Sequence, residues 1–212
     1  EISNDERVEK LKRVLFQAQL GTMYEKAQRV AKIGKFIAKA VDVGLADAKQ
    51  GNGLKTQVAR AAKLCKADLV SQVVGEFPKL QGVMGRVYAA MAGEPGDVPA
   101  AIEEHYRPAR SGGALPETRT GGLVAIADKM DSICGCFSVG LAPTGAADPY
   151  ALRRQAIGVV QILRAMNLSL SLRALIQFGL SQFGDKTADR KDDLTDAIYK
   201  FFESRIDGIL AD

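Results

Sequence analysis

Apolar residues recur at three- and four-residue steps along almost the whole of this 212-residue chain. Segment 5–19 carries one such stripe, and segments 21–41 and 54–74 carry two more. A stripe with this spacing covers one face of an α-helix, whereas a half-buried strand needs strict alternation of apolar and polar residues. No segment alternates convincingly, so we predict an all-α fold, with loops at 51–53 and 107–122, where Gly or Pro cluster.

Capping residues mark the starts of two predicted helices. Thr22 is placed to cap the helix that follows it. Farther along, a nearly continuous apolar run at 123–141 predicts a helix buried on most sides. After this run, Asp148 is placed to cap the next helix, and Pro149 suits its first turn, where the missing N–H group costs nothing.

Composition restricts the class of protein. The chain is 47% hydrophobic and 25% charged, which is ordinary for a soluble globular domain, and it has no apolar run long enough to span a bilayer. It begins with Glu1 and carries no leader pattern, so we expect an internal piece of a longer polypeptide. The odd number of cysteines favours a reducing, cytoplasmic setting, with Cys134 and Cys136 packed as small side chains.

Basic residues are concentrated in one helical segment. The net charge of +4 permits an anionic partner without requiring one. Five cations at three- and four-residue steps are expected to line one side of a helix; they are Lys26, Arg29, Lys32, Lys35 and Lys39. Such a face is either solvated or in contact with nucleic acid, and the run by itself leaves both interpretations open.

The sequence offers little for catalysis. His105 is the single histidine, and a Ser–His–Asp or Cys–His site would need it beside a nucleophile on a suitable turn. No G-x-S-x-G element, P-loop or dinucleotide-binding glycine motif is present. We therefore predict no catalytic residue in this chain, and interpret His105 as structural or solvated.

One spacing resembles the HD phosphohydrolase superfamily, a helical bundle that holds a divalent metal with histidine and aspartate. The blocks "KAQRVAKIGKFIA", "AAKLCKADLV" and "IADKMDSI" follow in the same order. The resemblance aligns the first metal-binding His with Lys26, the His-Asp pair with Ala67 and Asp68, and the late Asp with Asp128, with His105 in between. It implies an HD-like bundle that has lost its metal, because the Lys26 ammonium opposes a cation and can pair with the orphaned carboxylates.

Longer blocks resemble the β subunit of bacterial heterotetrameric glycyl-tRNA synthetases. They are "LGTMYEKAQRVAKIGKFIA", "KADLVSQVVGEFPKLQGVMGR" and "ADKMDSICGCFSVGLAPTGAADPYALRRQAIGVVQIL". The resemblance covers about residues 7–163. It implies an HD-like domain over 1–184 and a C-terminal helix over 185–212 that leads into the next domain of a longer chain.

The resemblance also implies the function. The enzyme joins glycine to its tRNA with ATP, and the α subunit is the catalytic unit. The complete enzyme would use ATP and Mg²⁺, whereas this piece is expected to hold no cofactor and no metal. The implied partners are the tRNA for glycine and the α subunit of an α2β2 heterotetramer, in the cytoplasm and without a membrane.

Five arginines are the candidate tRNA contacts, because arginine on a helix face or loop suits phosphate. They are Arg107, Arg110, Arg119, Arg153 and Arg154. For Arg153 and Arg154 the alternative is an internal ion pair with Asp128 or Asp131, which would hold the bundle together.

Two other functions remain open from the sequence. One is an active, metal-dependent HD-type phosphohydrolase. The other is a scaffold between domains or subunits, suggested by the amphipathic C-terminal segment, whose apolar residues are Leu194, Ile198, Phe201, Phe202, Ile206 and Leu210.

Overall fold

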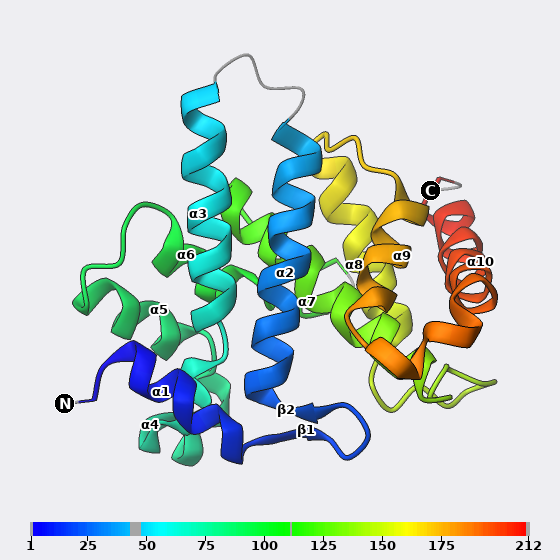
Figure 1. Ribbon diagram of the computed structural model, residues 1–212. Helices are drawn as coiled ribbons and strands as arrows, with labels where there is room; N and C mark the ends of the chain where they lie inside the picture. Colours follow the sequence, from blue (N-terminus) through cyan, green and yellow to red (C-terminus); the bar gives the residue numbers. More distant parts are fainter. Residues whose placement is uncertain (1, 43–47, 111, 211–212) are drawn as a thin grey trace.

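The computed structural model describes residues 2–42, 48–110 and 112–210, with the side chains at 42, 48–52 and 207–210 left aside. Within these ranges the fold consists of α-helices joined by short 3₁₀ turns and one small hairpin (Figure 1). The helices are α1 (Asn4–Lys10), α2 (Met23–Asp42), α3 (Ala48–Leu64), α4 (Gln72–Glu76), α5 (Val83–Met91), α6 (Val98–Glu104), α7 (Arg119–Ser138), α8 (Leu152–Ala165), α9 (Leu172–Ser181) and α10 (Lys191–Leu210). The all-α prediction is confirmed; the HD-like assignment stays a prediction.

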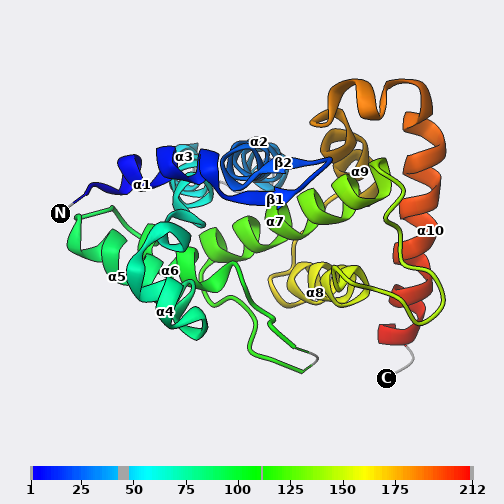
Figure 2. The ribbon, with the colours of Figure 1, turned by 90° about the horizontal axis from the view of Figure 1, so that it is seen from below.

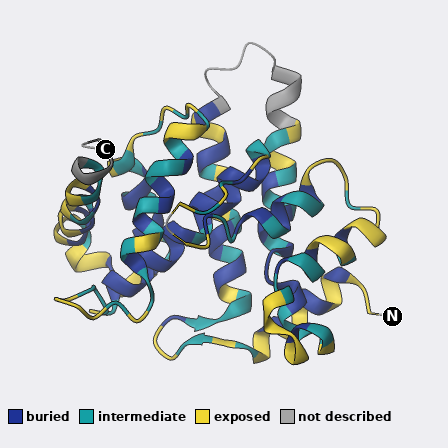
Figure 3. Ribbon diagram, turned by 180° about the vertical axis from the view of Figure 1, so that it is seen from behind, coloured by how far each residue is buried: buried dark blue, intermediate teal, exposed yellow. Residues whose placement is uncertain are grey.

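Helix α7 is the centre of the molecule. It packs against α2, α3, α6, α8, α9 and α10, and Figure 2 shows it crossing the interior between α2 on one side and α8 on the other. Every residue from 120 to 138 is buried except Asp128. The prediction of a helix buried on most sides is therefore confirmed, and the exposed residues lie on the surrounding elements (Figure 3).

The segment 5–19 differs from its predicted single helix. Helix α1 ends at Lys10, and the chain then forms an antiparallel hairpin from β1 (Leu15–Gln17) and β2 (Gly21–Thr22). Leu15, expected on the buried stripe, is 65% exposed. Turn chemistry overrides the helical stripe here, because the Gln17 side chain accepts hydrogen bonds from the backbone N–H groups of residues 19 and 20, and Gly21 adopts a φ of +86°.

The glycine segment 51–53 is also not a loop, because it lies inside α3. The helix continues through it into a stripe whose Val58 and Ala61 are fully buried. Packing of α3 against α2 thus outweighs the low helix propensity of glycine.

Local capping chemistry follows the sequence more closely. Thr22 Oγ1 accepts a hydrogen bond from the Glu25 backbone N–H (3.3 Å), and Glu25 Oε2 accepts one from the Thr22 backbone N–H (2.7 Å), as in a capping box. At the start of α8, the Asp148 carboxylate accepts from the backbone N–H groups of Leu152 (2.7 Å) and Arg153 (3.0 Å). Asp148 therefore caps α8 as predicted, but Pro149 lies in the preceding turn and not in the helix.

Helix α10 is the last helix of the chain and packs onto the rest of the fold. Its buried residues Leu194, Ile198 and Phe202 join the common core, and the helix packs against α7, α8 and α9. These apolar side chains are thus used within the chain; the side chain of Leu210 lies outside the described residues. The predicted boundary between 1–184 and 185–212 stays a prediction.

Two further expectations concern the class of protein. All three cysteines are buried free thiols, and burial raises the pKa of Cys65 to about 12, which makes it inert. In the described part of the chain, no helix is long and apolar enough to cross a bilayer.

Two glycines offer a matched test of the α2–α3 packing. A Cβ at Gly34 would lie 2.9 Å from Cγ1 of the fully buried Val58, whereas a Cβ at Gly53 would meet nothing within 4 Å. We expect Gly34→Ala to lower the free energy of unfolding by about 1–3 kcal/mol, and Gly53→Ala to raise it by about 0.5–1 kcal/mol. Urea titration of both variants checks this, and equal effects would contradict the close approach of α2 and α3.

Candidate functional site

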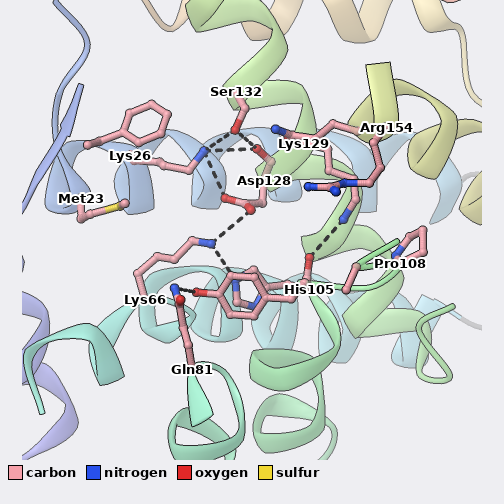
Figure 4. A pocket seen from close by; sticks show the side chains of 14 residues that line it. Met23, Lys26, Lys66, Gln81, His105, Pro108, Asp128, Lys129, Ser132 and Arg154 are labelled. Carbon is pink, nitrogen blue, oxygen red and sulfur yellow. Dashed lines mark hydrogen bonds and ion pairs between the residues drawn. The ribbon is translucent and has the colours of Figure 1, made fainter. Parts of the chain in front are cut away.

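A cavity of about 370 Å³ lies where α2, α7 and α8 meet the segments that follow α3 and α6 (Figure 4). Most of these elements contribute a charged side chain. The cations are Lys26 from α2, Lys66 from the turn after α3, Lys129 from α7 and Arg154 from α8, and the carboxylate is Asp128 from α7. The cavity is therefore predominantly basic.

Asp128 lies between two ammonium groups. Its Oδ1 is 3.2 Å from Lys26 Nζ, and its Oδ2 is 3.1 Å from Lys66 Nζ. The neighbouring lysines hold the pKa of Asp128 well below its usual range, against the opposing effect of burial. Both carboxylate oxygens are thus engaged by cations that belong to the chain.

Asp131 forms a second ion-pair cluster behind the first. Its carboxylate is fully buried, 3.0 Å from Lys26 Nζ and 2.6 Å from Arg29 Nε. Arg29 adds a second hydrogen bond from Nη2 (3.3 Å), so the contact is bidentate. Lys26 therefore links the two aspartates and ties α2 to α7.

His105 lies at the floor of the cavity and is fully buried. Its Nδ1 is 2.6 Å from the Ile102 carbonyl oxygen, and its Nε2 is 2.8 Å from Lys66 Nζ. A carbonyl only accepts and an ammonium only donates, so Nδ1 carries the proton and Nε2 accepts from Lys66. Burial, aided by Lys66, holds the pKa of His105 well below its ordinary value, and the ring is neutral.

This neutral histidine gives a pH prediction. The unfolded chain protonates His105 near pH 6.5, whereas the folded chain does not, so we expect the free energy of unfolding to fall by roughly 1.4 kcal/mol per pH unit below that value. Denaturant titrations from pH 7.5 to 5 measure the slope, and His105→Gln should flatten it. Burial raises the pKa of Asp68, which gives the opposite sign, so the difference between wild type and variant isolates His105. Identical slopes would contradict a neutral, buried ring.

Lys129 is held by backbone groups and, within the described ranges, forms no ion pair with a carboxylate. Its Nζ donates to the carbonyl oxygens of His105 (3.2 Å) and Arg107 (2.8 Å), and burial lowers its pKa to about 8. A Cβ at Gly158 of α8 would lie 3.1 Å from Lys129 Cε and 3.2 Å from Pro108 Cδ. The glycine thus allows α8 to approach both α7 and the loop after α6 at this point.

Three of the five HD-site positions come together at the cavity: Lys26, His105 and Asp128. Ala67 and Asp68 belong to the 3₁₀ turn η2 (Ala67–Val70). Asp68 Oδ2 accepts hydrogen bonds from the backbone N–H groups of Gly82 (2.6 Å) and Gly85 (3.1 Å), at the start of α5. The side chain that reaches Asp128 from this segment is the neighbouring Lys66, which the sequence did not single out.

The donor set does not fit a divalent cation. Both oxygens of Asp128 already contact ammonium groups, and a third lysine lies in the same cavity. Across the described ranges, no three His, Cys, Asp or Glu side chains gather as metal ligands. We derive no metal-dependent step from this site.

The five candidate arginines fall into two groups. Arg107 and Arg153 hold local structure: Arg107 pairs with Glu103 (3.2 Å) and Glu117 (2.9 Å), and Arg153 donates to the Gly145 carbonyl oxygen (2.7 Å). The structure does not support the internal pairing proposed for Arg153 and Arg154, because lysines and Arg29 engage the two aspartates.

Among the described residues, the other three arginines form no ion pair or side-chain hydrogen bond of this kind. Arg110 is exposed in the loop after α6, and Arg154 is exposed at the edge of the cavity. Arg119 is the first residue of α7 and is partly buried. Arg154 and Pro108 line the same cavity, so the loop and the start of α8 meet there.

The predicted basic face of α2 is in fact divided. Lys26 and Arg29 are buried against α7, whereas Lys32, Lys35 and Lys39 are exposed. Steps of three residues turn back by about 60° each around a helix, so a run of them crosses from one face to the opposite one. The first two members therefore stabilise the core, and the rest face solvent.

A family model for the glycyl-tRNA synthetase beta subunit matches residues 1–212, the whole chain. The chain belongs to this family. A glycine–tRNA ligase beta subunit from Desulforapulum autotrophicum is 52% identical over 208 residues, which cover 98% of this chain and 29% of the relative.

Other members of the glycyl-tRNA synthetase beta subunit family agree. Those from Desulfatibacillum aliphaticivorans and Geotalea uraniireducens are 49% and 47% identical, over 99% and 98% of this chain. The chain spans 29% of the length of each of these relatives. The predicted family membership is thereby confirmed.

Proposed function

We propose that this chain is a tRNA-binding helical module of the β subunit of glycine–tRNA ligase. In this proposal the α subunit joins glycine to tRNA with ATP and Mg²⁺, as part of an α2β2 enzyme in the cytoplasm. The names of the similar proteins support a glycine–tRNA ligase that has more than one kind of subunit. The distribution of arginines supports the role in tRNA binding.

The supporting observation is an excess of positively charged over negatively charged residues in two adjoining segments. Segment 105–122, which runs from the end of α6 into the first turn of α7, and helix α8 together contain six arginines and a single glutamate, Glu117. The two segments meet at the cavity, where Pro108 and Ala109 lie with Arg154. Arginines on a stable helix and an adjacent loop suit the phosphates of RNA, whose regular helices are recognised largely through backbone and shape.

The contacts of the arginines distinguish those that stabilise local structure from those that are free to bind phosphate. Arg107, through its pairs with Glu103 and Glu117, fixes the loop, and Arg153 fixes the turn before α8. Arg110 and Arg154 are exposed and present their guanidinium groups for phosphate. In this proposal Arg119, partly buried at the start of α7, contributes to the same positive surface.

Charge reversal in the loop tests the proposal. In the complete ligase, we expect Arg110→Glu to weaken tRNA binding several-fold, because fewer counterions are released when fewer phosphates are neutralised. The Arg107→Glu, Arg110→Glu double variant should weaken it at least tenfold, because Arg107→Glu also removes the ion pairs with Glu103 and Glu117 that hold the loop. The slope of log Kd against log salt should decrease in size by roughly one for each phosphate that the variant no longer neutralises. Filter binding at several salt concentrations measures both quantities.

The matched control is Lys79→Glu, an exposed lysine in the 3₁₀ turn η3 (Pro78–Leu80), which contributes nothing to the cavity lining. It should leave both affinity and slope unchanged. If the loop variants bind and charge tRNA as the control does, the loop is not a tRNA contact.

A further inference from the structure

The charges around the cavity do not balance. Lys26, Lys66, Lys129 and Arg154 line it together with one carboxylate, Asp128. The cluster behind it adds one cation, Arg29, and one carboxylate, Asp131. His105 is neutral, so cationic side chains outnumber carboxylates by three. A partly enclosed excess of this kind attracts an anion more strongly than exposed lysines do.

The excess is concentrated on the side formed by α7 and α8. Asp128 is already shared between Lys26 and Lys66, so their charges are largely compensated. Lys129, in contrast, donates to two backbone carbonyl oxygens, and Arg154 lies exposed at the edge of the same cavity (Figure 4). The two side chains come from adjoining helices and together can present one ammonium and one guanidinium to a single anion.

The volume and the lining restrict the anion. A space of about 370 Å³ exceeds the need of an inorganic ion and falls within the range of small-molecule sites. Beside the charges its lining includes Phe16 and Tyr106, whose rings lie against Lys26 and Lys66, and Gln81, whose amide donates to the Tyr106 hydroxyl. A space of this size beside an ammonium and a guanidinium suits a phosphorylated small molecule such as a nucleotide better than a simple carboxylate.

We propose that this cavity binds a phosphoryl group of a nucleotide, with Lys129 and Arg154 as its direct partners. The guanidinium of Arg154 gives paired hydrogen bonds to two phosphoryl oxygens, and Lys129 acts as a point charge from the protein side. Lys26 and Lys66 keep Asp128 neutralised, so the aspartate does not repel the ligand. The nucleotide is either a free mononucleotide or part of an RNA chain.

The site shares Arg154 with the proposed tRNA surface and in that respect rests on the proposed function, whereas Arg110 does not line the cavity. Loss of tRNA binding in Arg110→Glu would leave the cavity and its cations in place, and failure of AMP to bind in the cavity would leave the Arg110 contact with tRNA untouched. The two proposals therefore fail in different experiments.

Binding of AMP to the chain, measured by isothermal titration calorimetry with adenosine as the comparison, tests the site. We expect AMP to bind at least tenfold more tightly than adenosine, and Arg154→Gln to weaken AMP binding about tenfold. Arg164→Gln is the matched control, because Arg164 is an exposed arginine of the same helix that lies at a different pocket. Its effect should stay below twofold.

A second readout reports on Lys129. Burial lowers the pKa of Lys129 to about 8, and an adjacent phosphoryl group should raise it. AMP binding at pH 8 should therefore take up a fraction of a proton, detected in buffers of different ionisation enthalpy, whereas binding at pH 6 should take up almost none from this lysine. The phosphate of AMP releases or takes up protons near its own pKa, so AMP is compared with its methyl ester, which carries no such group.

Two results would overturn the site: equal affinity for AMP and adenosine, or equal effects of Arg154→Gln and Arg164→Gln. Lys129→Gln removes a buried partner and can unfold the chain, so the exposed Arg154 carries the decision. Competition then identifies the source of the phosphoryl group. Displacement of AMP by tRNA assigns the site to RNA, and simultaneous binding of both assigns it to a free mononucleotide.

Discussion

Replacement of Asp131 by asparagine is expected to lower the free energy of unfolding by about 3–5 kcal/mol. The carboxylate is fully buried and holds both Lys26 (3.0 Å) and Arg29 (2.6 Å). An amide of the same shape leaves the Arg29 guanidinium buried without its counterion, and an arginine cannot lose its charge. Urea denaturation monitored by circular dichroism measures the loss.

The chain supplies a matched control for this variant. Asp196 pairs with Arg173 at 2.7 Å, but both side chains are more than half exposed to solvent. Asp196→Asn should cost less than about 1 kcal/mol, because solvent screens an exposed ion pair. If both variants lost the same stability, the buried cluster would not hold α2 to α7 as the structure indicates.

Replacement of Asp128 by asparagine is expected to cost about 2–4 kcal/mol at pH 7, because Lys26 and Lys66 lose a carboxylate that they share. The effect should depend on pH. In the wild type, Asp128 raises the pKa of Lys66 above its ordinary value, so this stabilisation is complete below pH 10 and is lost only as the pH rises further.

Without Asp128, burial is the dominant influence on Lys66 and lowers its pKa, so we expect the folded pKa of Lys66 to fall below that of the unfolded chain. The unfolded chain then binds more protons between the two values, so the stability of Asp128→Asn should increase as the pH rises from 7 toward 10. The Asp131→Asn variant should recover much less, since Arg29 keeps its proton. Parallel pH profiles for the two variants would contradict this division between lysine and arginine partners.

The parts of the fold that depend on local chemistry could be predicted from the sequence. Thr22 and Asp148 satisfy backbone N–H groups within five residues of themselves, and the apolar run at 123–141 contains enough information to identify a buried helix. The hairpin at 15–22 could not be predicted in this way, because its closure depends on the positive φ of Gly21 and on the Gln17 side chain, which outweigh a plausible helical stripe.

The site is harder to predict because its contacts are long-range. Lys26 and Asp131 are separated by 105 residues and Lys66 and Asp128 by 62, so no local pattern pairs them. A signal is nevertheless present: Asp128, Lys129 and Asp131 are charged residues inside a largely apolar segment, and such residues need a partner from elsewhere in the fold. The resemblance to HD proteins identifies Lys26 and Asp128 correctly as residues of the cavity. It also names Asp68, but the Asp68 carboxylate caps α5, and the neighbouring Lys66 is the side chain that reaches the cavity.

The two lysines that flank Asp128 make the neutralisation of this buried carboxylate independent of the ions in solution. A metal ion bound inside a helical bundle is in equilibrium with the solution. It dissociates and exchanges with competing ions, and its occupancy depends on the concentration of the metal in the cell. Ammonium groups on Lys26 and Lys66 are permanent parts of the polypeptide. The positive charge that neutralises Asp128 is therefore present as soon as the chain is synthesised. A chelator cannot remove it, and it does not vary with the concentration of metal ions in the cell.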